Sequence, residues 1–292
     1  MQENLSVTLK DKWKWPKLIL KILVTATCLW YVAGKIEFQS AGKAIKAANP
    51  VYILIAAIAF IISKIISAFR LNIYFRNISI YIAQGPNLRL YWLGMFYNLF
   101  LPGSIGGDAY KVIRLTKKYG VPYKKTTAAV LLDRISGLAG LGLIMGFMSV
   151  FVFQNPVIPG LIIIGGIFSV GILYLAIRKW FPYFIPGFLP TLLAGIAVQA
   201  VQVICVCAIM TALGIPINNI EYLFLFLISS VVSVLPLTVG GLGIREVVFL
   251  EGAAYFGLQE EKSILISLLF YLITLITSAF GGLYVFRDPI TD

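Results

Sequence analysis

Residues 101–115 read LPGSIGGDAYKVIRL, and residues 235–250 read LPLTVGGLGIREVVFL. Both stretches open with Leu-Pro, place Ser or Thr two residues after the proline, and continue into Gly-Gly. Proline removes a backbone donor and stops a helix, whereas glycine admits backbone conformations and close contacts that other residues resist. Each stretch therefore predicts two short helices joined by a Pro/Gly turn. The two prolines are 134 residues apart, and at that offset Gly106 matches Gly240, Gly107 matches Gly241 and Lys111 matches Arg245.

The composition predicts a helical protein embedded in a membrane. Of the 292 residues, 60% are hydrophobic and 12% are charged, against about 25% charged in a typical soluble domain. Apolar runs of about 18 residues or more recur, and each is long enough to cross ~30 Å of hydrocarbon. The net charge of +12 comes mainly from Lys and Arg at the ends of these runs. There they set topology and meet anionic lipid, so no nucleic-acid partner is expected.

The expected fold is an all-α polytopic membrane protein with about six full spans and two re-entrant helical hairpins. The apolar segments before the two Leu-Pro turns, at about 88–101 and 220–235, are too short to span. Six basic residues and no acidic one lie between positions 111 and 125. The positive-inside rule then places both ends of the first segment in the cytoplasm, so it is expected to enter the membrane and turn back. The full spans are expected at about 17–34, 50–69, 126–153, 157–177, 188–213 and 263–286.

A single membrane domain is expected over residues 1–292, and it contains an inverted repeat. Its parts are an N-terminal basic segment with the first span (1–49), a first repeat half (50–153), a linking span (154–185) and a second half (186–286). Between the second and fifth spans the chain crosses the membrane an odd number of times, which inverts the second half. Inverted repeats typify transporters, whose substrate site lies at the repeat interface. Both termini are expected in the cytoplasm, and the membrane is expected to be a bacterial or archaeal plasma (inner) membrane.

The two turns are expected to form an anion site. Non-helical backbone at membrane depth survives where it is buried in protein or lines a wet cavity. A helix that restarts there presents unpaired N–H groups and the positive end of its dipole. Lys111 and Arg245 follow about one turn into their helices, so we expect them to bind a phosphate. The backbone residues assigned to the turns are Pro102, Gly103, Gly106, Gly107, Pro236, Gly240, Gly241 and Gly243.

Charged residues inside apolar segments complete the candidate set, because such residues are expensive in a membrane and usually functional. Asp108 is either an N-cap or a partner for Lys111, a proton or a headgroup. Asp133 is expected to pair with Arg114 or Lys111, or else to form an ion pair that fixes helix packing. The candidate substrate-binding residues are Asp108, Lys111, Arg114, Asp133, Arg134, Arg245 and Glu246.

Other features narrow the classes of function. Lys64 and Arg70, near the end of the second span, are expected to snorkel toward the membrane surface. The sequence has no histidine, no GxxxxGK[ST] motif and no dense acidic cluster. We therefore predict no catalytic residue, no metal site and no cofactor, and we do not expect an enzyme.

Three motifs in order, NLFLPGSIGGDAYKVIRL, LLDRISGLAGL and LPLTVGGLGIREVVFL, resemble the signatures of the lysylphosphatidylglycerol synthase transmembrane-region family, from about residue 15 to 286. In that family the best-understood members move an aminoacylated lipid between leaflets, and a separate soluble domain attaches the amino acid. The sequence ends six residues after Phe286, so the resemblance implies a lipid translocator and not the synthase. The family's motif residues fall on Asp108, on Lys111 or Arg114, and on Arg245 with Glu246.

The leading hypothesis is a lipid flippase or scramblase that moves a phosphate-containing lipid, aminoacylated or polyprenyl-linked, between leaflets. Its expected partners are membrane lipids, bound through an anionic headgroup or lipid phosphate. A homodimer, or association with cell-envelope biosynthesis proteins, is compatible with the sequence. The alternatives are a small-solute or ion-coupled transporter, a membrane enzyme acting on lipid-linked phosphate, and a non-transporting accessory subunit of a glycosyltransferase system.

Overall fold

A computed structural model describes residues 14–34, 38–100, 105–234, 238, 241–286 and 288–290, which form helices and connecting turns with no strand among them. The predicted turn residues Pro102, Gly103, Pro236 and Gly240 lie outside these ranges. In chain order the elements are α2 (Lys14–Ala33), α3 (Phe38–Ala47), α4 (Pro50–Arg76), α5 (Gln84–Phe100), α6 (Gly106–Tyr119), α7 (Tyr123–Val152), α8 (Val157–Trp180), η1 (Pro182–Gly187), α9 (Phe188–Ala212), α10 (Ile220–Val234), α11 (Ile244–Phe256), α12 (Glu260–Ala279) and η2 (Phe280–Tyr284).

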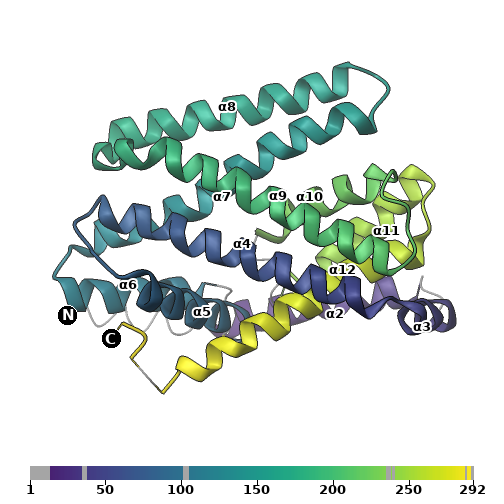
Figure 1. The fold of residues 1–292 in the computed structure, drawn as a ribbon, viewed down its shortest axis with the longest axis horizontal. Coiled ribbons are helices and arrows are strands. Elements are labelled where there is room, and N and C mark those ends of the chain that lie inside the picture. The colour runs from purple at the N-terminus through teal and green to yellow at the C-terminus, as the bar shows by residue number, and fades with distance from the viewer. Residues whose placement is uncertain are drawn as a thin grey trace.

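Helices α4 and α9 pack along each other and run antiparallel (Figure 1). Asn49 fixes the start of α4, because its side chain accepts a hydrogen bond from the Val51 amide (3.0 Å) and Pro50 suits the first helical position. The Asn49 amide also donates to the carbonyl of Ala212 at the end of α9 (3.0 Å). Helix α7 packs against α9, and α8 lies outside α7 at the edge of the bundle with few of its side chains buried.

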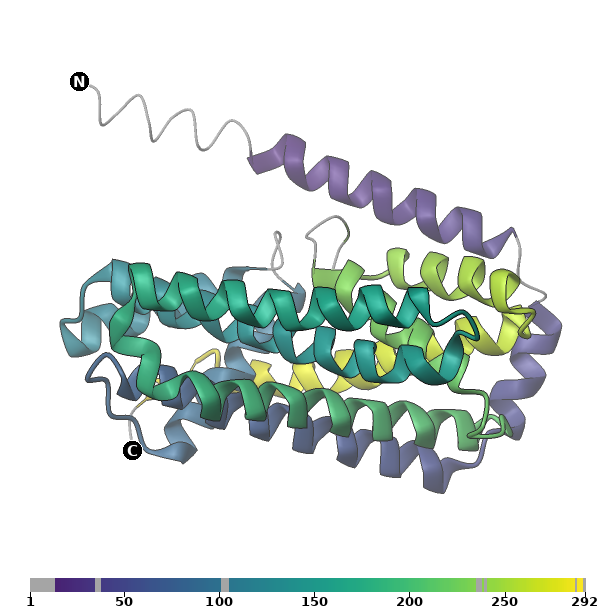
Figure 2. The same cartoon turned by 90° about the horizontal axis from the view of Figure 1, so that it is seen from above.

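The two pairs of short helices, α5–α6 and α10–α11, each reach across to the other half of the chain. Helix α5 contacts α12, and the indole Nε1 of Trp92 donates to the carbonyl of Thr277 (3.1 Å). Helix α10 contacts α7, and the ring of Phe224 meets Phe153 edge-to-face at 5.4 Å between ring centroids. The halves of the chain are therefore interlocked. Helix α2 lies along one side of the bundle against α11 (Figure 2).

Five of the helical segments are long and apolar enough to cross a membrane: α4, α7, α8, η1 with α9, and α12 with η2. They correspond to five of the six predicted spans, so the prediction of an all-helical, multi-pass membrane protein is confirmed. In α2, which holds the predicted first span, the apolar stretch found among the described side chains is Ile22–Ala33, which is shorter than a span. A sixth span therefore stays a prediction.

The paired short helices are too short to cross. They contain 17, 14, 15 and 13 residues in α5, α6, α10 and α11, or roughly 20–25 Å at 1.5 Å per residue. A hydrocarbon core is ~30 Å thick. Their lengths agree with the prediction that they enter and turn back, and re-entry itself stays a prediction.

Candidate functional site

A cavity of about 490 Å³ opens among the long helices and the inner ends of the two short pairs. Lys64 of α4, Gly137 of α7 and Gln199 of α9 all line it, and each lies within about one residue of the midpoint of its helix. The cavity therefore sits near half depth in any membrane that these helices cross.

Described parts of both Pro/Gly turns line this same cavity. Ile105, which precedes α6, and Gly241, which precedes α11, are both lining residues. The turns are built differently. In the second, Gly241 and Gly243 have φ of 82° and 88°, in the left-handed region that favours glycine. In the first, Gly107 packs so closely on α5 that an added Cβ would overlap the carbonyl of Gly94.

Two half-buried cations reach the cavity without a carboxylate partner. Lys64 lies over the ring of Phe60 at 4.5 Å from its centroid. Arg245 lies 5.2 Å from the centroid of Phe270 and donates to the hydroxyl of Ser233 (2.9 Å). Within the described ranges, neither cation forms an ion pair. A ring face and a hydroxyl compensate a buried cation less than a carboxylate does.

Arg70 also lines the cavity, but its charge is compensated by Asp133. The guanidinium Nε donates to the Asp133 carboxylate at 2.7 Å, and both side chains are 10% exposed or less. The expected pairing of Asp133 with Arg114 or Lys111 is wrong. The alternative, an ion pair that fixes helix packing, fits the contact between α4 and α7. The snorkelling expected of Arg70 is also wrong, because its side chain is buried toward α7 and not extended to the surface.

The carboxylate of Asp108, in the first turn of α6, contacts basic or amide side chains of three helices. Arg134 of α7 forms an ion pair with it. Lys111, one turn along α6, lies 3.3 Å away, and the Asn98 amide of α5 lies 3.4 Å away. The Asn98 side-chain oxygen accepts from the Gly107 amide at 2.9 Å. The carboxylate therefore ties the first turn to α7.

Glu246 is hydrogen-bonded to the backbone of the second turn and to α12. Its side chain is fully buried, and its two oxygens accept hydrogen bonds from the Gly243 amide (2.6 Å) and the Ser267 hydroxyl (2.8 Å). In the first turn, the Gly107 amide is likewise occupied by Asn98. Two of the amide donors that were expected to bind an anion, those of Gly107 and Gly243, are thus already used inside the chain, which favours the side-chain cations as the place for a phosphate.

Comparison with known proteins agrees with this architecture. The model of the family described as "Lysylphosphatidylglycerol synthase TM region" matches residues 18–193 and 183–282. The chain belongs to the lysylphosphatidylglycerol synthase transmembrane-region family. A curated relative, "UPF0104 membrane protein PH1989" of Pyrococcus horikoshii, is 25% identical over an alignment that covers 94% of this chain and 97% of the relative.

In this member of the family, some of the predicted site residues line the cavity and others do not. Arg134 and Arg245 line the cavity. Lys111 is 4% exposed, and the ring of Tyr91, which does line the cavity, lies 4.6 Å from its ammonium. Arg114 lies elsewhere, where it forms an ion pair with Asp288 near the C-terminal end.

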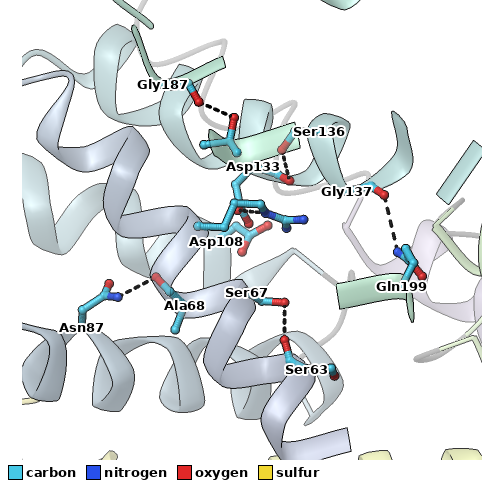
Figure 3. Close-up of polar contacts among 12 residues, drawn as sticks. Ser63, Ser67, Ala68, Asn87, Asp108, Asp133, Ser136, Gly137, Gly187 and Gln199 are labelled. Carbon is cyan, nitrogen blue, oxygen red and sulfur yellow. Dashed lines mark hydrogen bonds and ion pairs between the residues drawn. The ribbon is translucent and has the colours of Figure 1, made fainter. Parts of the chain in front are cut away.

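Sequence reasoning missed several lining residues of this family member. Gln199 and Gln202 of α9 are both lining residues and both nearly buried. In Figure 3 the Gln199 amide reaches the carbonyl of Gly137 (3.4 Å). The signal was present, since two glutamines three residues apart share one face of an otherwise apolar helix. The polar residues of α4 at 63, 64, 67 and 70 form a similar stripe.

The site of this family member carries an excess of positive charge. Five basic residues face the cavity or the residues beside it: Lys64, Arg70, Lys111, Arg134 and Arg245. Three carboxylates lie among them: Asp108, Asp133 and Glu246. The difference is two positive charges at the middle of the bundle. Such an arrangement can bind a phosphate or another anion, and a search of the described residues finds no cluster of potential metal ligands.

Proposed function

We propose that this protein moves a phosphate-containing lipid between the two leaflets of a membrane. The observation that carries the proposal is the cationic cavity at half depth, in which Lys64 and Arg245 have no carboxylate partner among the described residues. Uncompensated charge is costly inside a membrane. A bound lipid phosphate of one or two negative charges would offset the excess of two positive charges.

The proposed transport route passes between two re-entrant hairpins. Four short helices have inner ends beside one cavity, and the last long helix of each half packs against the hairpin of the other half. Antiparallel α4 and α9 support an inverted repeat of residues 50–153 and 186–286. Rocking of one half against the other would open the cavity to each leaflet in turn. Both termini are proposed to lie in the cytoplasm and the membrane to be the plasma (inner) membrane.

Lipid exchange in reconstituted vesicles tests this function. The protein is placed in vesicles that contain acyl-labelled fluorescent phospholipids, and a membrane-impermeant reductant bleaches the outer leaflet. We expect the inner-leaflet label to become accessible faster than in empty vesicles. The double variant Lys64→Met, Arg245→Met should lower the rate at least about tenfold, the change that ~1.4 kcal/mol of lost binding produces.

Arg114→Gln is the matched control, because it removes one positive charge from a residue that pairs with Asp288 and does not belong to the described lining. Its exchange rate should stay close to that of the unaltered protein. If no tested lipid exchanges faster than in empty vesicles, or if Arg114→Gln is as damaging as the double variant, the proposed function is contradicted.

A second candidate function is transport of a soluble organic phosphate. The same cationic lining favours it, since the charges recognise phosphate whether or not acyl chains are attached. Uptake of a radiolabelled soluble phosphate ester into the vesicles, without lipid exchange, would favour this candidate.

A further inference from the structure

The cavity contains neutral hydrogen-bonding groups as well as cations. Two amides of α9, Gln199 and Gln202, share the lining with two hydroxyls of α10, Ser230 and Ser233. The Asn98 amide of α5 and the Thr274 hydroxyl of α12 add to them. These groups come from four helices, so they surround the cavity and do not form a stripe on one element.

Two of these groups have polar atoms that lack a partner among the residues the structure describes. The Gln199 Oε1 and the Ser230 Oγ are buried and form no hydrogen bond with a described residue, and the two residues are only 9% and 8% exposed. The Gln199 amide nitrogen is committed to the carbonyl of Gly137 (3.4 Å), which leaves its oxygen as an open acceptor. Buried polar atoms in folded proteins usually have partners. Both atoms are buried beneath the cavity surface, so a ligand hydroxyl would pair with Gln199 or Ser230 after the side chain turns toward the cavity.

The charge of the lining restricts the ligand further. No carboxylate belongs to the described lining, and the turn residues at 101–104, 235–237 and 239–240 contain no Asp or Glu in the sequence. The nearby carboxylates of Asp108 and Asp133 are held by arginines. An amine on the headgroup would therefore enter a positive field without an anion to receive it.

On the basis of the proposed function, we propose that the lipid selected by this cavity carries an uncharged, hydroxyl-rich headgroup on its phosphate, such as a polyol or a sugar, and does not carry an amine. The phosphate contacts Lys64 and Arg245. The hydroxyls of the headgroup contact the neutral amides and hydroxyls of α9 and α10. Lipid recognition by this chain then differs from that of family members that move aminoacylated lipid.

A headgroup panel in the vesicle assay tests this selection. Four labelled lipids with identical acyl chains are compared: phosphatidylglycerol and phosphatidylinositol, with hydroxyl headgroups, and phosphatidylethanolamine and lysyl-phosphatidylglycerol, with amines. We expect the hydroxyl lipids to exchange at least about tenfold faster, the effect of one unfavourable contact of ~1.4 kcal/mol. Equal or faster exchange of the amine lipids overturns the headgroup assignment and leaves the proposed function standing. Absence of exchange for all four lipids overturns the proposed function itself.

A change of specificity provides a second, independent readout. Gln202→Glu replaces a neutral amide by a carboxylate of nearly the same shape, and the neighbouring Ser63 hydroxyl lies 3.5 Å from the amide nitrogen. We expect the rate ratio of amine to hydroxyl lipids to rise at least about tenfold, by the same contact energy with the opposite sign. The control Gln202→Leu removes the amide without adding charge, so it should slow the hydroxyl lipids and bring no gain for the amine lipids. A ratio that is the same in Gln202→Glu and Gln202→Leu would overturn the assignment.

An uptake assay with a soluble phosphate ester distinguishes a lipid substrate from a free phosphate ester. Radiolabelled glycerol 3-phosphate is supplied outside the same vesicles. We expect exchange of phosphatidylglycerol without uptake of the soluble ester. Uptake of the ester without lipid exchange would overturn both the lipid assignment and the proposed function.

Discussion

Replacing Asp133 by asparagine should destabilise the protein more than removing Asp133 and Arg70 together. The two side chains meet at 2.7 Å and are 10% exposed or less. At that separation and an effective dielectric constant of ~20, their attraction is about 6 kcal/mol. Desolvation of the two ions costs several kcal/mol each, so the pair adds little net stability over apolar groups. Removing only the carboxylate, however, leaves the Arg70 guanidinium buried and uncompensated, at a cost of ~3–5 kcal/mol.

The measurement is a double-mutant cycle on the free energy of unfolding. Asp133→Asn, Arg70→Met and the double variant are titrated with SDS in mixed micelles, and tryptophan fluorescence follows unfolding. We expect Asp133→Asn to cost ~3–5 kcal/mol and the double variant to recover at least about 2 kcal/mol of that loss. If the single and double variants cost the same, Arg70 is stabilised by something other than Asp133, for instance water in the cavity, and the reasoning fails.

Three further predictions concern the turns and the C-terminal end. Gly107→Ala should lower the melting temperature by at least about 2 °C through ~1–3 kcal/mol of overpacking against Gly94. Gly165→Ala, whose Cβ meets open space in α8, should change it little, and equal shifts would contradict the close contact. Glu246→Gln should cost ~1–3 kcal/mol in SDS unfolding, because an amide nitrogen would face a donor that the carboxylate now satisfies; a loss no larger than that of Glu251→Gln would contradict this role. Burial raises the pKa of Asp288, but hydrogen bonding and the charge of Arg114 outweigh burial and hold the pKa below its ordinary value. The Arg114 contact therefore stabilises the C-terminal docking above pH ~4 and is lost as pH falls through the lowered pKa. A nitroxide at position 286, where Phe286 is 97% exposed, should become more mobile in that direction by EPR, whereas Asp288→Asn should be mobile at every pH.

Much of the architecture could be predicted from short-range sequence signals. The spans follow from apolar length, and five of them agree with helices that the structure describes. The Pro/Gly turns follow from residues that stop helices, and Ile105 and Gly241 show that parts of both turns reach one cavity. These features depend on local chemistry, which a single sequence carries directly.

The pairing of charges could not be predicted, because it depends on which helices become neighbours. Lys111 and Arg245 occupy matching positions in the sequence, yet only Arg245 lines the cavity. Asp108 explains the difference, since it offers Lys111 a carboxylate one turn away, whereas Leu242 stands at the matching place in the second turn. Gly94 also leaves room for the Lys111 side chain between α5 and α6.

The charges at the centre of this bundle have two kinds of environment, and the difference bears on function. Asp108 and Asp133 each bind an arginine of another helix, and such pairs fix the positions of helices while adding little net stability. Lys64 and Arg245 have only aromatic rings and a serine hydroxyl as described partners. Apolar side chains of similar volume would stabilise the bundle better than these two cations do. Replacing both by methionine should therefore raise the free energy of unfolding while the transport rate falls. That combination is the pattern expected of residues retained for binding and not for packing.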